Sequence, residues 1–463
     1  MDFDLVVLGA GSGGYACALR AAQLGMNVAM VERDLVGGTC LHRGCIPTKA
    51  LLHAAEVADA ARDGGQFGVH ATLDKVDLAG VQSYSDGVVA KLYKGLTGLV
   101  RARGITVVTG EGRLVLDDGR AAVAVGDDLY RAPYVVLGSG SVPRSLPGVA
   151  VDGEVVLTSD TALRLGQLPG SAIVLGGGVI GCEFASAWRS FGVEVTIVEA
   201  LPRLVAAEEP ASSAALERAF RKRGISLATG VALTSCTRTG AGVAVELADG
   251  RQLSADVLLV AVGRGPASSG LGYAEAGVTL DRGFVSVDGR LETSLPGVFA
   301  VGDLVQGLQL AHRGFAHGMF VAEEVAYRTG RSETAPVLPV DRDIPRVTYS
   351  DPEVASVGLT EEAARAEFGD VETLTYDLGG NGRSQILRTS GFVKLVRRPD
   401  GPVVGVHMVG ARVGELIGEA QLITGWDAYP AEVAAMPHAH PTQHEALGEA
   451  HLALAGRPLH VHG

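Results

Sequence analysis

The sequence predicts an α/β protein with two parallel-sheet domains followed by an α+β domain. An apolar strand, a glycine turn, a helical pattern and a second apolar strand ending in an acid occur at 4–32 and again at 172–199. Such strand–helix–strand units build mainly parallel sheets. After about residue 345 the pattern changes to strand candidates Phe392–Val396 and Val403–Val409, with helical patterns beyond them. The length of 463 residues, at roughly 100–200 residues per domain, allows about three domains.

Three stretches rich in proline and glycine are the expected boundaries between these parts. They are residues 141–154, 263–272 and 330–345.

Composition narrows the class of protein. A content of 47% hydrophobic and 20% charged residues is typical of globular proteins, and no apolar run is long enough to predict a membrane span. A net charge of −13 argues against nucleic acid as a partner. The strand-like run Leu5–Leu8 begins almost at the first Met, so we expect no targeting segment and a cytoplasmic protein. Five cysteines are too few for a secreted disulfide scaffold.

The first repeat carries the pattern G-x-G-x-x-G at Gly9, Gly11 and Gly14. These glycines allow a tight turn, a close approach to a pyrophosphate and close packing of helix on strand. Glu32 follows Gly14 by 18 residues, where its carboxylate can accept hydrogen bonds from ribose hydroxyls. The agreement of strand, helix and acid favours a dinucleotide site over an ordinary glycine turn.

The second repeat carries the same pattern at Gly176, Gly178 and Gly181, with Glu199 again 18 residues further on. We therefore expect two Rossmann-like dinucleotide-binding domains. An acid at this strand end favours the 2′-hydroxyl of NAD over the 2′-phosphate of NADP. Arg203 lies nearby and is a minor argument for NADP, because an arginine can bind a 2′-phosphate. Its alternative interpretation is a solvated surface arginine.

Cys40 and Cys45 lie five residues apart, whereas the other cysteines are scattered. In a regular helix this spacing is about 7.5 Å along the axis, beyond the roughly 7 Å Cα limit for a disulfide. We therefore expect a distorted helix, with Pro47 and Gly44 as the cause. Two dinucleotides beside a dithiol suggest electron transfer from nicotinamide through flavin to a disulfide. The alternative is two unrelated thiols.

The segment 37–52, GGTCLHRGCIPTKALL, resembles the active-site stretch of the flavoprotein disulfide reductases. The resemblance continues through 138–141 (GSGS), 262–264 (VGR), 301–303 (VGD) and 440–445 (HPTQHE). It implies an FAD-binding domain at 1–145 and 271–340, an NAD-binding domain at 146–270 and a C-terminal dimerisation domain at 341–463.

The resemblance also implies roles for the candidate catalytic residues. Cys40 would attack the substrate, and Cys45 would face the flavin. Lys49 would lie near the flavin ring and pair with Glu183, for which a solvent-facing helix acid is the alternative. His440 would be the general base and Glu445 its orienting partner, because a thiol with a pKa near 8.5 must lose a proton to become a nucleophile.

Candidate cofactor-binding residues combine the two glycine patterns with the positions that the resemblance adds. They are Gly9, Gly11, Gly14, Glu32, Thr39, Lys49, Ser139, Gly140, Gly302, Asp303 and His312 for FAD, and Gly176, Gly178, Gly181, Glu199 and Gly263 for NAD.

Histidines near the C-terminus offer a competing metal-site interpretation. They are His438, His440, His444, His451, His460 and His462. No cysteine or paired carboxylate completes a recognisable ligand set, so we expect no metal.

Within the family, the chain is most similar to the NAD-using lipoamide dehydrogenase branch. Glu199 and the segments 310–318 and 380–396 carry this likeness, and the absence of cysteine after His440 argues against the mercuric and large thioredoxin reductases. The resemblance implies a homodimer that oxidises dihydrolipoyl groups on a lipoyl-bearing acyltransferase or a glycine-cleavage-type carrier protein. An NAD(P)H-dependent reductase of a small disulfide and a structural flavoprotein of a multienzyme complex remain alternatives.

Overall fold

The computed structural model describes residues 3–240 and 242–460, and the chain divides into two units. The first unit comprises Met1–Ala50, Ala79–Arg144 and Gly263–Asp341. The second comprises Leu51–Leu78, Ser145–Val262 and Arg342–Gly463. No helix among the described residues is both long and apolar enough to cross a membrane.

The first unit is built on a five-stranded parallel sheet. Its strands, in spatial order, are β20 (Val298–Ala300), β7 (Tyr134–Leu137), β1 (Leu5–Leu8), β2 (Val28–Glu32) and β3 (Thr106–Thr109). The central strand β1 is buried along its whole length. A sheet covered on both faces requires such continuous apolar strands.

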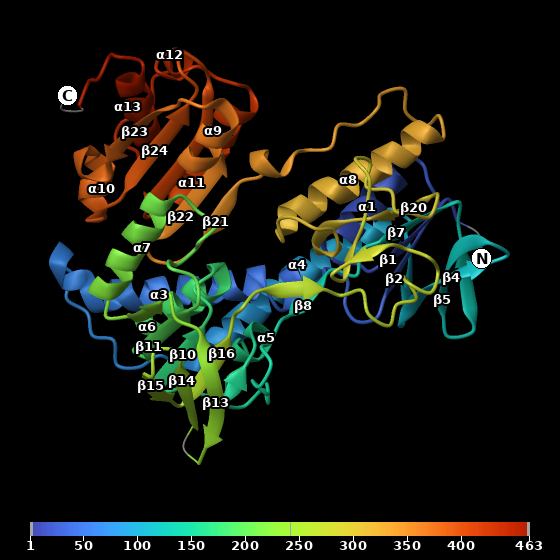
Figure 1. Cartoon of the computed structure of the whole chain (residues 1–463), viewed down its shortest axis with the longest axis horizontal. Coiled ribbons are helices and arrows are strands. Elements are labelled where there is room, and N and C mark those ends of the chain that lie inside the picture. Colours follow the sequence, from blue (N-terminus) through green and yellow to red (C-terminus); the bar gives the residue numbers. More distant parts are fainter. Residues whose placement is uncertain (1–2, 241, 461–463) are drawn as a thin grey trace. The chain divides into compact units, whose positions relative to one another are not determined.

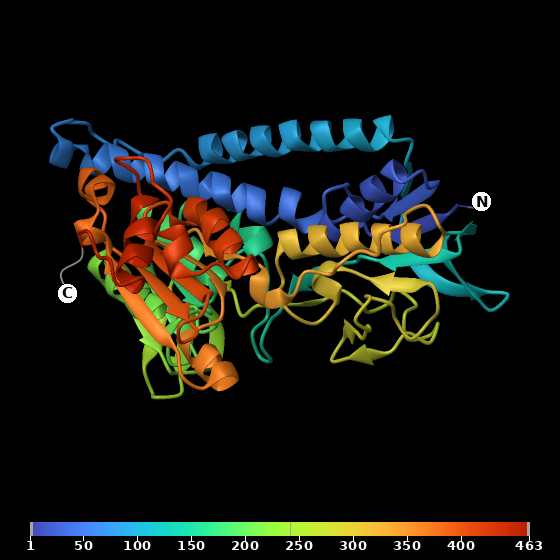
Figure 2. The same ribbon diagram turned by 90° about the horizontal axis from the view of Figure 1, so that it is seen from above.

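Helices α1 (Ser12–Gln23) and α8 (Ala311–Arg328) pack side by side in this unit (Figure 1). Their backbones meet at glycines, since a Cβ on Gly318 would lie 2.2 Å from the carbonyl oxygen of Gly13. The long helix α4 (Leu78–Ala102) continues unbroken for 25 residues (Figure 2).

The remaining strands of the first unit form small antiparallel sheets. They are β4 (Gly112–Asp117), β5 (Arg120–Val125) and β6 (Asp128–Arg131), the pair β8 (Ser141–Pro143) and β17 (Arg264–Pro266), and the pair β18 (Leu280–Asp281) and β19 (Phe284–Val285). Strands β8 and β17 come from two of the stretches expected as boundaries. These stretches are therefore partly ordered by pairing with each other.

The second unit repeats the parallel-sheet design. Its strands, in spatial order, are β12 (Ser226–Thr229), β11 (Glu194–Glu199), β10 (Ser171–Leu175), β16 (Val257–Val260) and β9 (Val156–Leu157). Helices α5 (Ser159–Ala162), α6 (Val179–Ser190) and α7 (Pro210–Lys222) accompany it, as does an antiparallel sheet of β13 (Leu233–Thr239), β14 (Gly242–Leu247) and β15 (Gln252–Ala255). The order β10, α6, β11 matches β1, α1, β2, which confirms the repeat.

The C-terminal part of the second unit is an antiparallel sheet with helices, as expected. Its strands, in spatial order, are β21 (Arg346–Thr348), β22 (Glu353–Gly358), β25 (Val403–Gly410), β24 (Phe392–Arg397) and β23 (Glu372–Asp377). Its helices are α9 (Glu361–Phe368), α10 (Gly382–Leu387), α11 (Val413–Gly425), α12 (Pro430–Val433) and α13 (Glu445–Leu454). The two predicted strands are β24 and β25.

Buried charges join this sheet to the segment before α7 within the second unit. Glu208 accepts a hydrogen bond from Arg346 Nε at 3.1 Å, and Glu209 accepts one from Lys394 Nζ at 2.6 Å. Both glutamates are almost fully buried. Removing one partner of such a pair would leave a charge without compensation in a medium of low polarity.

We expect Gly181→Ala to destabilise the second unit, because the new Cβ would lie 1.9 Å from the carbonyl oxygen of Gly176. Such overpacking typically costs about 1–3 kcal/mol. In thermal unfolding this corresponds to a melting temperature lower by roughly 2–4 °C for each kcal/mol. Gly178→Ala is the matched control, because a Cβ there meets no atom within 4 Å. Equal melting temperatures for the two variants would contradict the packing argument.

Candidate active site

The first glycine turn connects β1 to α1. A Cβ on Gly14 would lie 1.8 Å from the carbonyl oxygen of Gly9, so strand and helix touch through backbone alone. Gly11 caps α1, and a Cβ built on it meets no atom within 4 Å. Open space at a helix N-terminus with unpaired N–H groups suits a phosphate. The turn therefore fits the pyrophosphate of a dinucleotide.

Glu32 ends β2 beside this turn. Its Oε2 accepts a hydrogen bond from the Ala10 N–H at 2.8 Å, and its Oε1 accepts one from the Asp34 N–H at 2.9 Å. Each carboxylate oxygen has a second lone pair, so Glu32 can still accept from ribose hydroxyls. The backbone thus holds the carboxylate in the position that the sequence predicts.

The second glycine turn reproduces these contacts. Glu199 Oε2 accepts from the Gly177 N–H at 2.6 Å, and Oε1 accepts from the Leu201 N–H at 2.7 Å. Arg203 instead donates to the carbonyl oxygens of Ala206 at 2.6 Å and Glu208 at 3.2 Å. The guanidinium of Arg203 is therefore bound to backbone of the following segment, which weakens the argument that Arg203 binds the 2′-phosphate of NADP.

The cysteine pair lies where one helix stops and another starts. Helix α2 (Gly38–His42) contains Cys40, and helix α3 (Cys45–Asp63) begins with Cys45. The predicted distortion is confirmed, because the helical stretch is interrupted between the two cysteines, at Gly44, one of the two residues expected to cause it. Pro47 is the third residue of α3, in the first turn, where helical N–H groups have no partner within the helix. The break itself falls at Arg43 and Gly44.

Both cysteines are thiols whose side chains are hydrogen-bonded to each other. This hydrogen bond and burial raise the pKa of Cys40, while the charge of Lys49 lowers it. Lys49 lies one turn into α3 and is the cation that the sequence places near the site. The pair is arranged for dithiol and disulfide chemistry, because its sulfurs already face each other.

The dithiol is packed onto the first nucleotide turn. A Cβ on Gly38 would lie 2.6 Å from Gly11 Cα, and the Gly37 N–H donates to the Ala10 carbonyl oxygen at 2.8 Å. Burial, followed by the charges of Cys40 and Cys45, raises the pKa of Tyr15 in α1 to about 12. Helix α2, which carries Cys40, therefore adjoins the turn that fits a pyrophosphate.

Two further contacts connect the end of helix α2 to the segment after β2. His42 Nε2 donates to the Val36 carbonyl oxygen at 2.9 Å, and Arg43 forms an ion pair with Asp34. Thr39, a candidate cofactor-binding residue, contributes its carbonyl oxygen to the end of α2 by accepting from the Arg43 N–H at 2.8 Å.

The remaining candidates of the first unit gather around β7, β8 and β20. Asp303 Oδ2 accepts from Ser141 Oγ at 2.6 Å, and Ser141 Oγ in turn accepts from Arg264 Nε at 2.8 Å. Sequence reasoning missed the supporting roles of Ser141 and Arg264, although both lie within the quoted motifs. Ser139 Oγ donates to the Ala267 carbonyl oxygen at 2.7 Å, so this hydroxyl connects the segment after β7 to the segment after β17.

Glycines at the same edge have left-handed backbone conformations. Gly140 and Gly302 have φ of +74° and +67°, and Gly263 has φ of +99°. His312 is the second residue of α8.

Glu183 is 2% exposed, so its interpretation as a solvent-facing acid is wrong. Its Oε1 accepts from the Tyr349 N–H at 3.0 Å. The pairing of Glu183 with Lys49 stays a prediction.

His440 and Glu445 are brought together by a turn before α13. His440 Nδ1 donates to Glu445 Oε1 at 2.8 Å, and Glu445 Oε2 accepts from the Thr442 N–H at 2.8 Å. Burial alone would raise the pKa of Glu445, but the Thr442 N–H and His440 outweigh it and lower the pKa. The His440 side chain is 79% exposed, which leaves its ring accessible to a thiol from outside the unit.

The other histidines have different surroundings. His438 and His444 both bond to Glu419, and His460 bonds to Glu449. Burial lowers the pKa of His451 to about 4. Among the described residues, no three or more histidines, cysteines or acids are arranged to hold a metal ion, and His462 lies outside those residues.

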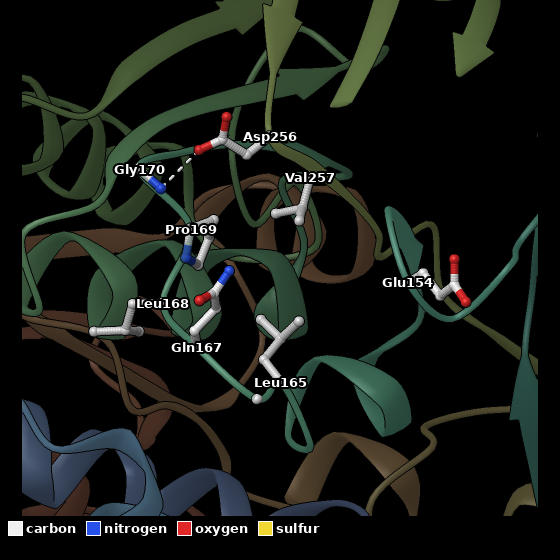
Figure 3. A pocket seen from close by; sticks show the side chains of 9 residues that line it. Glu154, Leu165, Gln167, Leu168, Pro169, Gly170, Asp256 and Val257 are labelled. Atoms are coloured by element: carbon white, nitrogen blue, oxygen red, sulfur yellow. Dashed lines mark hydrogen bonds between the residues drawn. The ribbon is translucent and has the colours of Figure 1, made fainter. Parts of the chain in front are cut away.

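A hollow of about 460 Å³ in the second unit contains none of the candidate residues (Figure 3). Its lining is Glu154, Leu165, Gly166, Gln167, Leu168, Pro169, Gly170, Asp256 and Val257. Asp256 accepts from the Gly170 N–H at 2.7 Å and the Ser171 N–H at 3.0 Å. Its carboxylate therefore braces the start of β10.

We predict that NAD+ outcompetes NADP+ by at least about tenfold in kcat/KM, because Glu199 accepts from a 2′-hydroxyl and repels a phosphate. Glu199→Gln should narrow this ratio, since it removes the repulsion. Glu32→Gln is the matched control at the equivalent position of the first unit and should leave the ratio unchanged. Steady-state kinetics with both nucleotides measures this, and equal efficiency in the wild-type enzyme would contradict it.

Comparison with known proteins agrees with this geometry. The family model described as pyridine nucleotide-disulphide oxidoreductase matches residues 3–318, and the model of its dimerisation domain matches residues 344–451. A dihydrolipoyl dehydrogenase of Bacillus subtilis is 39% identical, with 99% of each chain covered. That of Chlorobaculum tepidum is also 39% identical, covering 97% of this chain and 96% of the relative.

Solved structures have the same fold. LpdA from Mycobacterium tuberculosis superposes with a TM-score of 0.89 at 28% identity, covering 97% of this chain and 99% of that one. The flavoprotein disulfide reductase RclA from Escherichia coli, in a Cu(II) complex, has a TM-score of 0.85 at 25% identity, covering 98% of this chain and 100% of that one. The chain belongs to the pyridine nucleotide-disulphide oxidoreductase family.

Proposed function

We propose that this chain is a dihydrolipoyl dehydrogenase that oxidises dihydrolipoyl groups and reduces NAD+. The observation that carries the proposal is the Cys40 and Cys45 pair, held thiol to thiol and packed by Gly38 onto a dinucleotide turn. Full-length relatives at up to 39% identity that are named dihydrolipoyl dehydrogenase support the substrate.

FAD and NAD are the cofactors. The turn of Gly9, Gly11 and Gly14 would hold FAD, with Glu32 as an acceptor for its ribose hydroxyls. The equivalent turn of Gly176, Gly178 and Gly181 would hold NAD, with Glu199 in the same role. When bound, FAD supplies a carrier that accepts an electron pair from a dithiol and delivers it as hydride to nicotinamide. The two glycine turns, with open space at the helix N-termini, fit these groups.

The reaction would begin with the oxidised enzyme, in which the two thiols of Cys40 and Cys45 have been joined as a disulfide. His440 accepts a proton from a substrate thiol, which becomes the thiolate nucleophile. The thiolate attacks the sulfur of Cys40, a substrate–Cys40 bond forms, and the Cys40–Cys45 bond breaks to leave a Cys45 thiolate. The second substrate thiol attacks the substrate sulfur of this mixed disulfide, which closes the lipoyl ring, and its proton passes to the Cys40 sulfur that leaves. Return of Cys40 and Cys45 to the disulfide, with their electron pair passed on to NAD+ when both cofactors are bound, would complete the overall change of dihydrolipoyl and NAD+ into lipoyl, NADH and a proton.

Glu445 keeps the His440 ring oriented through Nδ1, so that Nε2 is the proton acceptor. The lowered pKa of Glu445 means that it is ionised at neutral pH and stabilises the imidazolium that forms. The hydrogen bond to Cys45 and burial raise the pKa of Cys40, and the charge of Lys49 offsets part of this rise, which favours the thiolate more than a neutral side chain would.

The protein forms a homodimer through its C-terminal dimerisation domain. We place the His440 and Glu445 of one protomer at the dithiol of the other, which accounts for the large exposure of His440 in the single chain. A lipoyl group on an acyltransferase or a glycine-cleavage-type carrier protein is the physiological substrate.

The decisive experiment compares two reactions of the purified holoenzyme. Dihydrolipoamide with NAD+ should turn over at least about a hundredfold faster than NADPH with glutathione or mycothiol disulfide, because substrate and nucleotide both match the site. A faster reaction with a small disulfide would favour the second candidate function. That candidate is supported by the similarity to a flavoprotein disulfide reductase.

The roles of the two cysteines can be separated by variants. If Cys45 faces the flavin, reduction of the wild-type enzyme by two electrons should produce a long-wavelength absorbance, which Cys45→Ser abolishes. Cys40→Ser should show this absorbance even in the resting enzyme, because its Cys45 has no disulfide partner and the positive charge of Lys49 would favour its thiolate. Absorbance in Cys45→Ser but not in Cys40→Ser would reverse the assignment.

A further inference from the structure

A single carboxylate bonds to both sides of the turn that carries His440. Glu419 lies on α11, outside the sequence motifs that predict the active site. Its Oε1 accepts from His438 Nε2 at 2.7 Å, and its Oε2 accepts from His444 Nδ1 at 2.8 Å. His438 precedes His440 by two residues, and His444 directly precedes Glu445. Both ends of the segment 438–444, which we name the base loop, are therefore tied to one side chain.

The first of these contacts is mostly shielded from water. The His438 side chain is 13% exposed and that of Glu419 is 28% exposed, whereas His444 is 44% exposed. The other edge of the His438 ring lies against α13, because a Cβ on Gly448 would be 2.5 Å from His438 Nδ1. His438 is thus wedged between the carboxylate on α11 and the backbone of α13.

The charges favour the same arrangement. The hydrogen bond to Glu419 is the largest contribution to the raised pKa of His438. Burial alone would raise the pKa of Glu419, but the hydrogen bonds from His438 and His444 outweigh it and lower the pKa. Charge-assisted hydrogen bonds are roughly twice as strong as neutral ones, so the carboxylate is a firm anchor at neutral pH.

The second contact reaches the helix that presents the partner of the base. His444 is the N-cap residue of α13, and Glu445 is its first residue. Helix α11 is anchored in turn, since Leu416 and Ile417 belong to the core cluster of the C-terminal sheet. Helix α11 therefore fixes the positions of His440 and Glu445 relative to each other through Glu419.

We infer that Glu419 is a positioning residue for the His440–Glu445 pair, and that it controls thiol deprotonation without touching the substrate. This inference rests on the proposed function, in which His440 is the general base. It predicts that the loss of Glu419 harms only the half-reaction that needs His440, because reduction of the enzyme by NADH bypasses the substrate thiol.

The central test is a double-mutant cycle in the holoenzyme with Glu419→Ala, His440→Gln and the double variant. We expect Glu419→Ala to lower kcat for dihydrolipoamide by about ten- to a hundredfold, because a small misplacement of a catalytic group can cost about a hundredfold. In the His440→Gln background the same change should cost less than about twofold, since residues that act through one another are not additive. Glu419→Gln should recover part of the rate, because its amide oxygen can still accept from one imidazole.

The matched control is Glu449→Gln. Glu449 lies on α13 in the same domain and accepts from His460 Nδ1 at 2.8 Å, but His460 lies outside the base loop. This variant should keep the wild-type rate with dihydrolipoamide. Reduction of the enzyme by NADH should stay within about twofold of wild type in every variant with an intact dithiol. Hydrogen exchange of the base loop should rise in Glu419→Ala and not in the control.

Three results would overturn the inference while leaving the proposed function intact. The first is a low kcat for dihydrolipoamide in His440→Gln together with a wild-type kcat in Glu419→Ala. The second is an equal loss of kcat from Glu419→Ala with His440 present and with His440→Gln. The third is a loss in the rate of enzyme reduction by NADH that equals the loss with dihydrolipoamide. A His440→Gln enzyme with the wild-type rate would instead overturn the assignment of the base, and the role of Glu419 with it.

Discussion

The close contact of backbone with backbone at the first glycine turn is the constraint on which the site depends. Strand β1 and helix α1 meet through Gly9 and Gly14, and helix α2 meets the same turn through Gly38. A side chain at Gly14 or Gly38 would clash with the backbone of this turn, and a side chain at Gly9 would clash with the backbone of Gly138. The open space at the N-terminus of α1 and the place of the two cysteines are consequently set by one cluster of small residues.

The chain uses the same electrostatic device at both nucleotide turns. A glutamate at the end of the second strand is held by two backbone N–H groups, one from the glycine turn and one from the residue two positions on. This arrangement fixes a negative charge beside each glycine turn at little conformational cost, because backbone donors are already ordered. Arg203, though near Glu199 in sequence, donates instead to the carbonyl oxygens of Ala206 and Glu208.

Carboxylate–imidazole pairs organise the C-terminal part of the second unit in a comparable way. Glu445 orients His440, and Glu419 binds the histidines on either side of it. The carboxylates accept hydrogen bonds from the imidazoles, and these bonds give an exposed turn a defined geometry. The dithiol needs packing and the base needs hydrogen bonds, because a thiol is weakly polar whereas an imidazole must keep one tautomer.

The sequence by itself determined the two βαβ repeats, the C-terminal strands, the dithiol and the His440–Glu445 pair. Glycine spacing, strand-end acids and short motifs encode local geometry that few other folds can satisfy. Only the tertiary structure decided that a new helix begins at Cys45 with Pro47 in its first turn, that Glu183 is buried and that Glu419 bonds to both ends of the base loop. These features depend on which surfaces meet after folding, and long-range packing leaves no periodic trace in the chain.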